Sequence, residues 1–539
     1  MPPKKKVDER APSTMKDLKD TLWKAAVKLR GSMDASQYKD VVLGIVFLKY
    51  VSDAFENRRD QITSELAADG WSDSQIEPML RDVDEYRAHN VFWVPPTAQW
   101  SYLAQHAKGL PAIDGQPHKN IGQLIDEAME LLDGSNPALK GATPRGFNRD
   151  YVDQRRLGEL IDLFNGARFT GLGASRARDL LGEVYEYFLG NFARSEGRRA
   201  GEFFTPASVV CTLVEVLEPT RGRVYDPACG SGGMFVQAEK FLAAHNQDLT
   251  AISIYGQENT QQTWRLARMN LAIHGLNGSL GAVWGDTFAI DLHADVEMDY
   301  VMSNPPFNQD DWVRKDDDLR WRYGVPPARN ANYAWIQHVI SKLAPAGSAG
   351  VVMANGSMSS NSGGEGDIRA QLVEADLVSC MVALPTQLFR STGIPVCVWF
   401  FAKDKTKGKG GSVDRSGEVL FIDARALGFM VDRAERALSD EDIAKIAGTF
   451  RAWRGTESAK EEGLTYADVP GFCKSATLAE IKVADYALAP GRYVGAADID
   501  DDGEPIEAKI ERLTKDLFAQ FDESARLDAV VRKQLGRIA

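Results

Sequence analysis

The spacing of apolar residues changes along the chain and divides it into regions. From about residue 13 to residue 167, apolar positions recur at helical intervals, and Val41, Ile45 and Leu48 share one broad face. A further helix is expected at 173–192. Between about 201 and 423, short apolar runs alternate with helical stretches, and the expected strands include 222–225, 252–257, 300–303, 350–354, 378–384 and 396–402. This alternation predicts an α/β fold with a doubly wound sheet.

The C-terminal part of the chain returns to helical spacing. Ser439 is suited to cap a helix that runs to Arg454, and Gly455 suits its end. Before that helix, the lysine- and glycine-rich stretch 403–411 predicts an exposed hairpin loop between two strands. In 505–538, apolar residues recur near a seven-residue repeat. This last stretch predicts a long helix that either binds a partner or packs back on its own chain.

A short motif after the strand at 300–303 has the composition of a site for a planar amine. It consists of Asn304, Pro305, Pro306 and Phe307. The side-chain oxygen of Asn304 and the backbone carbonyl of the turn offer two acceptors for the two N–H donors of an exocyclic amino group. Phe307 offers a stacking surface for the ring that carries the amine. A tight turn alone explains the same residues, but the neighbouring motifs favour methyl transfer to an amino group.

A glycine-rich loop follows the strand at 222–225. Asp226 ends that strand, and the loop then contains Gly230, Ser231, Gly232 and Gly233. Glycines let the backbone approach a ligand closely, and a carboxylate at the end of the strand can hold a cationic amino group. A glycine turn of any doubly wound domain is the alternative. A nicotinamide site fits less well, because Phe235 stands where the third glycine would be.

Acidic residues follow two further apolar runs. Glu258 comes after 252–257, where its carboxylate can accept hydrogen bonds from the hydroxyls of a ribose, and a solvated glutamate is the alternative. Asp286 comes after 282–285, where it can accept from an adenine amino group. A segment upstream of the glycine loop adds aromatic surface, a hydroxyl and a helix-starting proline, with a helix cap as the alternative: Glu202, Phe203, Phe204, Thr205, Pro206 and Ala207.

Composition and charge narrow the class of protein. The 539 residues include 76 acidic and 63 basic ones, a net charge of −13, which is unexpected for a protein that grips DNA by itself. We find no apolar run long enough to span a bilayer and no secretory signal, so a cytoplasmic location is expected. The five cysteines form no Cys-x-x-Cys pair and the seven histidines are scattered. Neither a disulfide framework nor a metal site is expected.

Together these residues resemble the N6-adenine DNA methyltransferases. The order Phe-Thr-Pro, Asp-Pro-Ala-Cys-Gly-Ser-Gly-Gly and Asn-Pro-Pro-Phe is similar to that of the modification subunits of type I restriction-modification systems. The stretches 43–50, 388–395 and 488–493 also look like that family, and the resemblance covers nearly the whole chain, more weakly beyond residue 400. It implies S-adenosyl-L-methionine bound by 202–207, 231–233 and Glu258, with an adenine flipped out of the duplex and held at 304–307.

The resemblance also implies partners. Two such subunits join one specificity subunit that reads double-stranded DNA, and a separate restriction and translocation subunit uses ATP. No Gly-x-x-x-x-Gly-Lys-Ser/Thr loop occurs here. On this basis the chain is expected to divide into a basic disordered tail (1–12), a helical N-terminal domain (13–167), an S-adenosylmethionine-dependent methyltransferase domain (168–435), a helical or irregular extension (436–503) and a long partner-binding helix (504–539).

Two other functions and one segment stay open. A glutamine-methylating enzyme uses a similar corner, because a side-chain amide presents the same planar amine, although the long helical flanks argue against so small a task. A non-catalytic scaffold that retains the motifs is disfavoured, because each motif position is intact. The polar segment 308–332 is too long for an ordinary connection. It is either a mobile loop that orders over DNA or cofactor, or a decorated surface loop.

Overall fold

The chain forms two compact units, residues 1–494 and 495–539, and each is considered by itself. The computed structural model describes residues 19, 23–24, 26–27, 33, 35–112, 118–166, 184–192, 205–389, 394–408, 410–433, 435–496 and, between 510 and 527, twelve helical positions of the second unit. Of the expected site residues, Glu202, Phe203 and Phe204 lie outside these described residues. No helix in the described ranges is long and apolar enough to cross a membrane.

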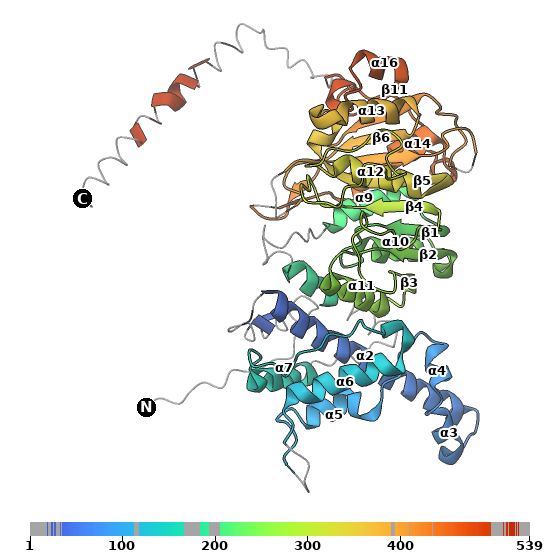
Figure 1. The fold of residues 1–539 in the computed structure, drawn as a ribbon, viewed down its shortest axis with the longest axis vertical. Coiled ribbons are helices and arrows are strands. Elements are labelled where there is room, and N and C mark those ends of the chain that lie inside the picture. The colour runs from blue at the N-terminus through green and yellow to red at the C-terminus, as the bar shows by residue number, and fades with distance from the viewer. Residues whose placement is uncertain are drawn as a thin grey trace. The chain divides into compact units, whose positions relative to one another are not determined.

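Helices fill the N-terminal region, as the apolar spacing predicts (Figure 1). Their apolar faces meet in one core that includes Phe47, Leu124 and Phe164, each nearly inaccessible to solvent. The described part of the helix expected at 173–192, residues 184–192, is helical and joins the same core. The main helices are α2 (Ala35–Ala68), α3 (Asp73–Met79), α4 (Val83–Arg87), α5 (Trp100–Gln105), α6 (Ile121–Ser135) and α7 (Gln154–Gly166).

A sheet of nine strands follows, in the order β11-β8-β6-β7-β5-β4-β1-β2-β3. Strands β3, β2, β1, β4 and β5 are parallel, whereas β7 is inserted antiparallel between β5 and β6. The predicted strands and the α/β fold are confirmed. The bounds are β1 (Gly222–Asp226), β2 (Ile252–Gly256), β3 (Gly278–Ser279), β4 (Met298–Ser303), β5 (Leu343–Ala354), β6 (Val378–Ala383), β7 (Val396–Ala402), β8 (Glu418–Asp423) and β11 (Cys473–Thr477), with a separate pair β9 (Phe429–Met430) and β10 (Arg436–Ala437).

Helices cover both faces of the sheet because successive strand residues point to opposite sides. Val352 belongs to one apolar core, whereas its neighbours Val351 and Met353 belong to the other. The first core is covered by α9 (Ala207–Leu217), α10 (Gly233–Ala244), α11 (Gln261–Ile273) and α14 (Asp440–Arg454). The second is covered by α12 (Asn332–Lys342), α13 (Glu365–Glu374) and α16 (Leu478–Val483). The shorter α15 spans Glu457–Glu461.

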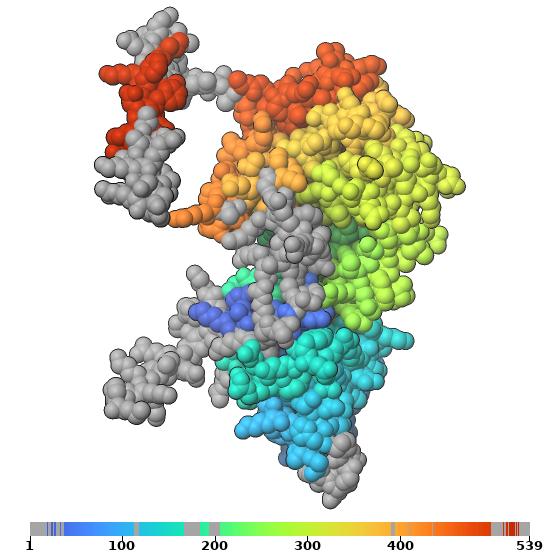
Figure 2. All heavy atoms as spheres, turned by 60° about the vertical axis from the view of Figure 1, so that its left-hand side comes forward, coloured from blue at the N-terminus to red at the C-terminus, as the bar shows by residue number. Residues whose placement is uncertain are grey.

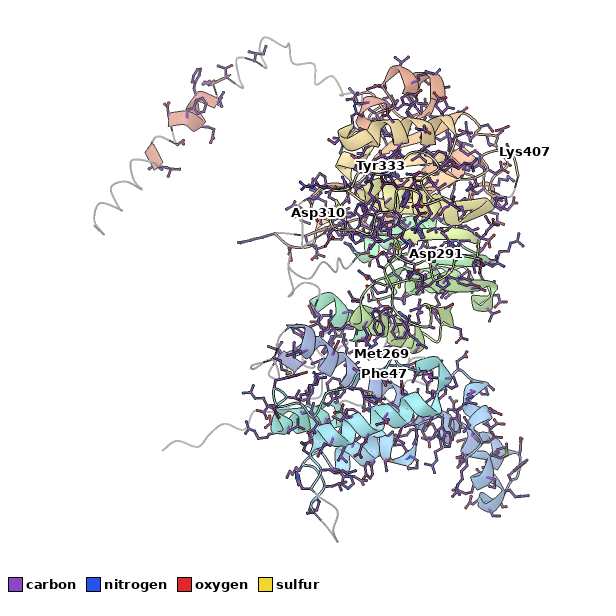
Figure 3. The ribbon with its side chains drawn as sticks, in the orientation of Figure 1. Phe47, Met269, Asp291, Asp310, Tyr333 and Lys407 are labelled. Atoms are coloured by element: carbon purple, nitrogen blue, oxygen red, sulfur yellow. The ribbon has the colours of Figure 1, made fainter. Side chains whose placement is uncertain are left out.

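Helix α11 contacts two cores. Trp264 and Leu271 face the sheet, whereas Met269 packs among the N-terminal helices beside Phe47 (Figure 3). The hydroxyl of Tyr50 on α2 also donates to the carbonyl of Ile273 over 2.7 Å. Figure 2 shows in space-filling form that the cyan part of the N-terminal region also lies directly against the green part of the chain. The N-terminal region is therefore anchored to the sheet region through one shared helix.

The C-terminal predictions had mixed outcomes. The helix predicted at 439–454 is confirmed, with Ser439 as its cap and Gly455 in the left-handed conformation at its end. The predicted hairpin at 403–411 is wrong, because β6 lies between β7 and β8 and the segment is a crossover. Its Lys405 is not exposed either: the ammonium is ion-paired with Asp376 and donates to two backbone carbonyls. A charged side chain is buried here because partners distant in sequence satisfy it.

The second unit is helical at each described position between 510 and 527, as the seven-residue repeat predicts. Its large apolar side chains are about half exposed or more: Ile510, Leu517, Phe518, Phe521 and Leu527.

The shared helix yields a first prediction. Met269→Ala removes a side chain that is 1% exposed, so the free energy of unfolding should fall by about 2–5 kcal/mol. The midpoint of urea denaturation measures the change. Met430→Ala is the matched control, because Met430 is 43% exposed and its truncation should cost less than about 0.5 kcal/mol. Equal midpoints for the two variants would contradict the packing described for α11.

Candidate active site

Strand pairing brings the glycine-loop motif and the Asn-Pro-Pro-Phe motif together. Strands β1 and β4 are parallel neighbours, with Val224 opposite Tyr300 and Tyr225 opposite Val301. Their carboxyl ends therefore meet at one edge of the sheet, which is where ligands bind in open α/β folds. There the hydroxyl of Ser303 donates to Oδ1 of Asp226 over 2.7 Å, although the two residues are 77 positions apart.

Asp226 is buried at this edge. The same oxygen also accepts from the backbone N–H of Ala228 at 3.0 Å. Burial nevertheless raises the pKa of Asp226 to about 7, because it outweighs these two hydrogen bonds. Within the described part of the chain, no lysine or arginine forms an ion pair with this carboxyl group. A ligand cation placed beside it would favour the ionised form.

The glycine loop leaves space beside its backbone. Gly230 and Gly232 have φ angles of +53° and +80°, which residues other than glycine rarely adopt. A Cβ atom built at Gly230 or Gly233 would have no neighbour within 4 Å among the residues that the structure describes. Packing within the chain therefore does not explain why side chains are missing at these two positions. The loop has the form of a cradle that a ligand can fill.

Glu258 links the glycine loop to the next segment. Its Oε2 accepts from the N–H of Gly230 at 3.1 Å, and its backbone carbonyl accepts from the N–H of Gly285 at 2.8 Å. Oε1 accepts from the N–H of Thr260 at 2.9 Å. Oε1 also lies 3.2 Å from the hydroxyl of Thr260, so these bonds together fix the orientation of the carboxylate beside the glycine loop.

Asp286 lies in a loop rather than at the end of a strand. Its Oδ1 accepts from the N–H groups of Phe288 and Ala289 at 2.8 and 2.9 Å. The side chain thereby closes its own turn, beside the backbone that Glu258 holds. Backbone and side-chain hydrogen bonds thus bring Asp226, Glu258 and the Asp286 turn to one edge of the sheet.

Asn304 presents a buried acceptor. The side chain is 9% exposed, and its Nδ2 donates to the hydroxyl of Thr205 over 2.9 Å. Its Oδ1 is buried and has no hydrogen-bond partner among the described residues. Leaving such an atom unpaired costs about 1–3 kcal/mol, so its retention points to a ligand rather than to stability. In this arrangement Nδ2 faces Thr205, so Oδ1 is the atom that a ligand donor would meet.

The rest of the motif is held by neighbours that sequence reasoning missed. Phe307 is half-buried and meets Phe389 edge to face, with ring centroids 5.8 Å apart. Asn308 follows with a positive φ, and its backbone N–H and side-chain oxygen pair reciprocally with the amide of Asn332 at 2.9 Å each. Asparagine tolerates this conformation better than most residues. The asparagine at position 308 was therefore the one feature of the sequence that could have indicated a left-handed residue directly after the motif.

Two further features concern the chemistry of the site. Burial raises the pKa of the Cys229 thiol well above its ordinary value, so the neutral thiol packs in the loop and is no nucleophile. No cluster of three or more His, Cys, Asp or Glu suited to a metal ion occurs in the ranges that the structure describes.

Helix α9 begins at Ala207, with Pro206 as its cap, next to the Thr205 whose hydroxyl contacts Asn304.

Comparisons with known proteins agree with this geometry. A family model described as N-6 DNA Methylase matches residues 176–502, and one described as HsdM N-terminal domain matches residues 18–164. The type I restriction enzyme HindI methylase subunit of Haemophilus influenzae is 46% identical over 82% of this chain and 99% of its own length. The type I restriction enzyme MjaIX methylase subunit of Methanocaldococcus jannaschii is 38% identical over 96% of this chain and 91% of its own.

A solved structure shares the fold. The type I restriction-modification system methyltransferase subunit from Streptococcus thermophilus aligns with a TM-score of 0.72 and 24% identity, over 89% of this chain and 100% of that one. The family model spans more than half of the chain, and the two relatives are matched over nearly their whole length. This chain therefore belongs to the N6-adenine DNA methyltransferases and, within them, to the methylase subunits of type I restriction enzymes.

Proposed function

We propose that the chain transfers a methyl group from S-adenosyl-L-methionine to N6 of a DNA adenine that has been flipped out of the duplex. The observation that carries this proposal is the buried Oδ1 of Asn304, which has no hydrogen-bond partner among the described residues and lies at the edge of the sheet where the glycine loop is. An acceptor in that position suits an amino group that must be held and polarised. The exocyclic amine of adenine is such a group.

The residues at the sheet edge fit the cofactor. Asp226 has a buried carboxyl group that a cationic amino group would stabilise in its ionised form. The open cradle at Gly230 and Gly233 admits a ligand against the backbone. In this proposal Glu258 accepts hydrogen bonds from the ribose hydroxyls of the cofactor, and Asp286 accepts from its adenine amine. When bound, the cofactor supplies a methyl group on a sulfonium, which is an excellent leaving group.

The chain's own contribution is mostly positioning. The adenine amine is a poor nucleophile because its lone pair is delocalised into the ring. Hydrogen bonds accepted by Oδ1 and by the backbone carbonyl of Asn304 draw electron density onto the nitrogen and fix its direction. Holding two reactants in line contributes on the order of 7–11 kcal/mol. Phe307 offsets part of the few kcal/mol that base flipping costs by stacking on the extruded base.

Sequence recognition belongs to a separate subunit in this proposal. The net charge of −13 opposes strong binding to phosphates by this chain alone. The exposed apolar residues of the second unit, such as Leu517 and Phe518, suit a partner helix. We therefore propose a complex of two copies of this chain with one specificity subunit on double-stranded DNA, joined by a restriction and translocation subunit. The five-part division of the chain and a cytoplasmic location remain predictions.

The role of Asn304 can be tested directly. Asn304→Ala should lower the methylation rate by roughly 100-fold or more, because a preorganised partner of the reacting group is lost, while the dissociation constant for S-adenosyl-L-methionine stays within about threefold. Asn136→Ala is the matched control, since its buried amide bonds Trp93 and Leu132 far from the motifs. An Asn304→Ala protein that assembles normally and methylates like wild type would support a non-catalytic scaffold instead.

The role of Asp226 predicts a pH dependence. The carboxyl group of the free protein loses its proton near pH 7, and only the ionised form attracts a cation. The dissociation constant for S-adenosyl-L-methionine should therefore rise as pH falls from 7.5 to 5.5, approaching tenfold per unit below about 7. The amino group of the cofactor stays protonated in this window. Asp226→Asn should bind weakly and lose this dependence, which calorimetry at several pH values would show.

A control without cofactor checks the same pKa. The folded protein keeps the Asp226 proton up to about pH 7, whereas the unfolded chain loses it near 3.8. The contribution of this carboxyl group to stability is thus full below about pH 4 and is lost as pH rises to about 7. The unfolding temperature of wild type should fall relative to Asp226→Asn across that range. A constant difference would show that the buried carboxyl group is not perturbed.

The division of labour calls for a reconstitution. Labelled methyl transfer to DNA should be measured with this chain alone and with a co-expressed candidate specificity subunit, followed by nucleoside analysis. We expect N6-methyladenine in the complex and little with the chain alone. Sequence-specific methylation by the chain alone would show that it carries its own recognition. Label in protein rather than DNA would favour the glutamine-methylating alternative.

A further inference from the structure

The long segment 308–331 is fixed against the Asp286 turn. Its Trp312 and Trp321 are both less than 10% exposed and pack with Phe288 and Trp335 in a separate aromatic core. Phe288 lies two residues after Asp286, and its ring centroid is 5.0 Å from that of Trp312. The segment that follows the Asn-Pro-Pro-Phe motif is thus packed on the proposed cofactor side of the site. The segment is thus anchored through its two tryptophans, while residues between them such as Leu319 stay exposed at the surface.

Arg320 is the polar centre of this contact. Its guanidinium pairs with both oxygens of Asp318, through Nε at 2.9 Å and Nη2 at 2.6 Å. Nη1 donates to the carbonyl of Thr287 at 2.8 Å and Nη2 to that of Phe288 at 3.0 Å. These carbonyls belong to the two residues that follow Asp286. The side chain is 15% exposed, so water competes little for these bonds.

Three further hydrogen bonds connect this contact to the residues that flank Asp226: two run through His338 to the side chain of Tyr225, and one runs from Thr287 to the backbone of Pro227. Nη1 of Arg320 lies 3.1 Å from Nδ1 of His338, and since a guanidinium can only donate, Nδ1 must accept. Burial lowers the pKa of His338 to about 3, so the ring is neutral and its proton is on Nε2, which faces the hydroxyl of Tyr225 at 3.3 Å. On the other side, the hydroxyl of Thr287 donates to the carbonyl of Pro227 at 2.7 Å.

We propose that Arg320 is a positioning residue that holds the Asp286–Phe288 turn, and through it and His338 the Pro227 backbone and the Tyr225 side chain on either side of Asp226, in the arrangement that receives the adenosyl part of the cofactor. The proposal rests on the proposed function, because it names a role toward the same cofactor. Arg320 also connects the two halves of the site, because it belongs to the segment that follows the target-base motif and contacts the residues of the cofactor side. Neither Arg320 nor Thr287 touches the reacting atoms.

The geometry calls for arginine in particular. The planar guanidinium reaches a carboxylate on one edge while it donates to two backbone carbonyls and a ring nitrogen elsewhere, with Trp321 stacked at 5.3 Å. A lysine ammonium is a point charge with three donors and cannot reproduce this fork. Arg320→Lys should therefore restore the charge and only part of the order in the turn.

The test compares cofactor affinity with stability. Arg320→Gln should raise the dissociation constant for S-adenosyl-L-methionine by roughly tenfold or more, with Arg320→Lys in between. At saturating cofactor, the methylation rate of the reconstituted complex should change by less than about threefold, because the target-base motif is untouched. Arg454→Gln is the matched control. Arg454 is also a buried arginine that donates to backbone carbonyls, those of Lys405, Gly410 and Val413, but it lies outside the site.

The control variant should lose thermal stability and keep wild-type affinity within about twofold. Thr287→Val is a milder second variant that removes the bond to Pro227 and keeps the shape; it should raise the dissociation constant about threefold or more. The proposal is overturned if Arg320→Gln and Thr287→Val bind the cofactor as wild type does. It is also overturned if affinity falls only in proportion to stability in Arg320→Gln, Thr287→Val and Arg454→Gln alike. Wild-type protein that binds no S-adenosyl-L-methionine would instead overturn the proposed function, and this inference with it.

Discussion

The hydrogen bond between Ser303 and Asp226 depends on the parallel pairing of β1 and β4, and the site depends on both. The pairing places the end of one motif beside the end of the other, and the bond fixes the carboxylate relative to the strand that continues into Asn304. A slip by one residue would send the side chains of β4 to the opposite face of the sheet. The two halves of the reaction are therefore aligned by backbone register before any ligand is present.

The site departs from the rule that buried polar groups find partners. Burial disfavours the ionised form of Asp226, and the Oδ1 of Asn304 has no hydrogen-bond partner among the described residues. Elsewhere the same chain satisfies harder groups: Lys405 and Arg454 are buried with several acceptors each. Other buried atoms without a partner occur elsewhere in the described residues, Trp100 Nε1 and Ser379 Oγ among them, so the site is distinguished by having such an acceptor beside a buried carboxyl group and an open glycine loop.

The sequence predicted what is encoded locally. The strands, the capped helix from Ser439 and the motif positions follow from short patterns of spacing and residue type. The partners of those positions did not follow, because Thr205, Ser303 and Asn332 reach their neighbours through strand order and packing across long separations. Strand order also explains the error at 403–411. This segment connects β7 to β8, and because β6 lies between these two strands the connection is a crossover and no hairpin. The roles of the site residues remain proposals.

Helix α11 shows that the boundary between the two matched family regions is not a boundary between folding units. The N-terminal core takes Leu266, Met269 and Ile273 from a helix that lies about a hundred residues further along the chain and also packs on the sheet. A fragment ending near residue 167 would keep its own helices and leave an uncovered apolar hollow where α11 belongs. Such a fragment should aggregate or recruit a substitute helix. The two family models thus divide a part of the chain whose two apolar cores share one helix.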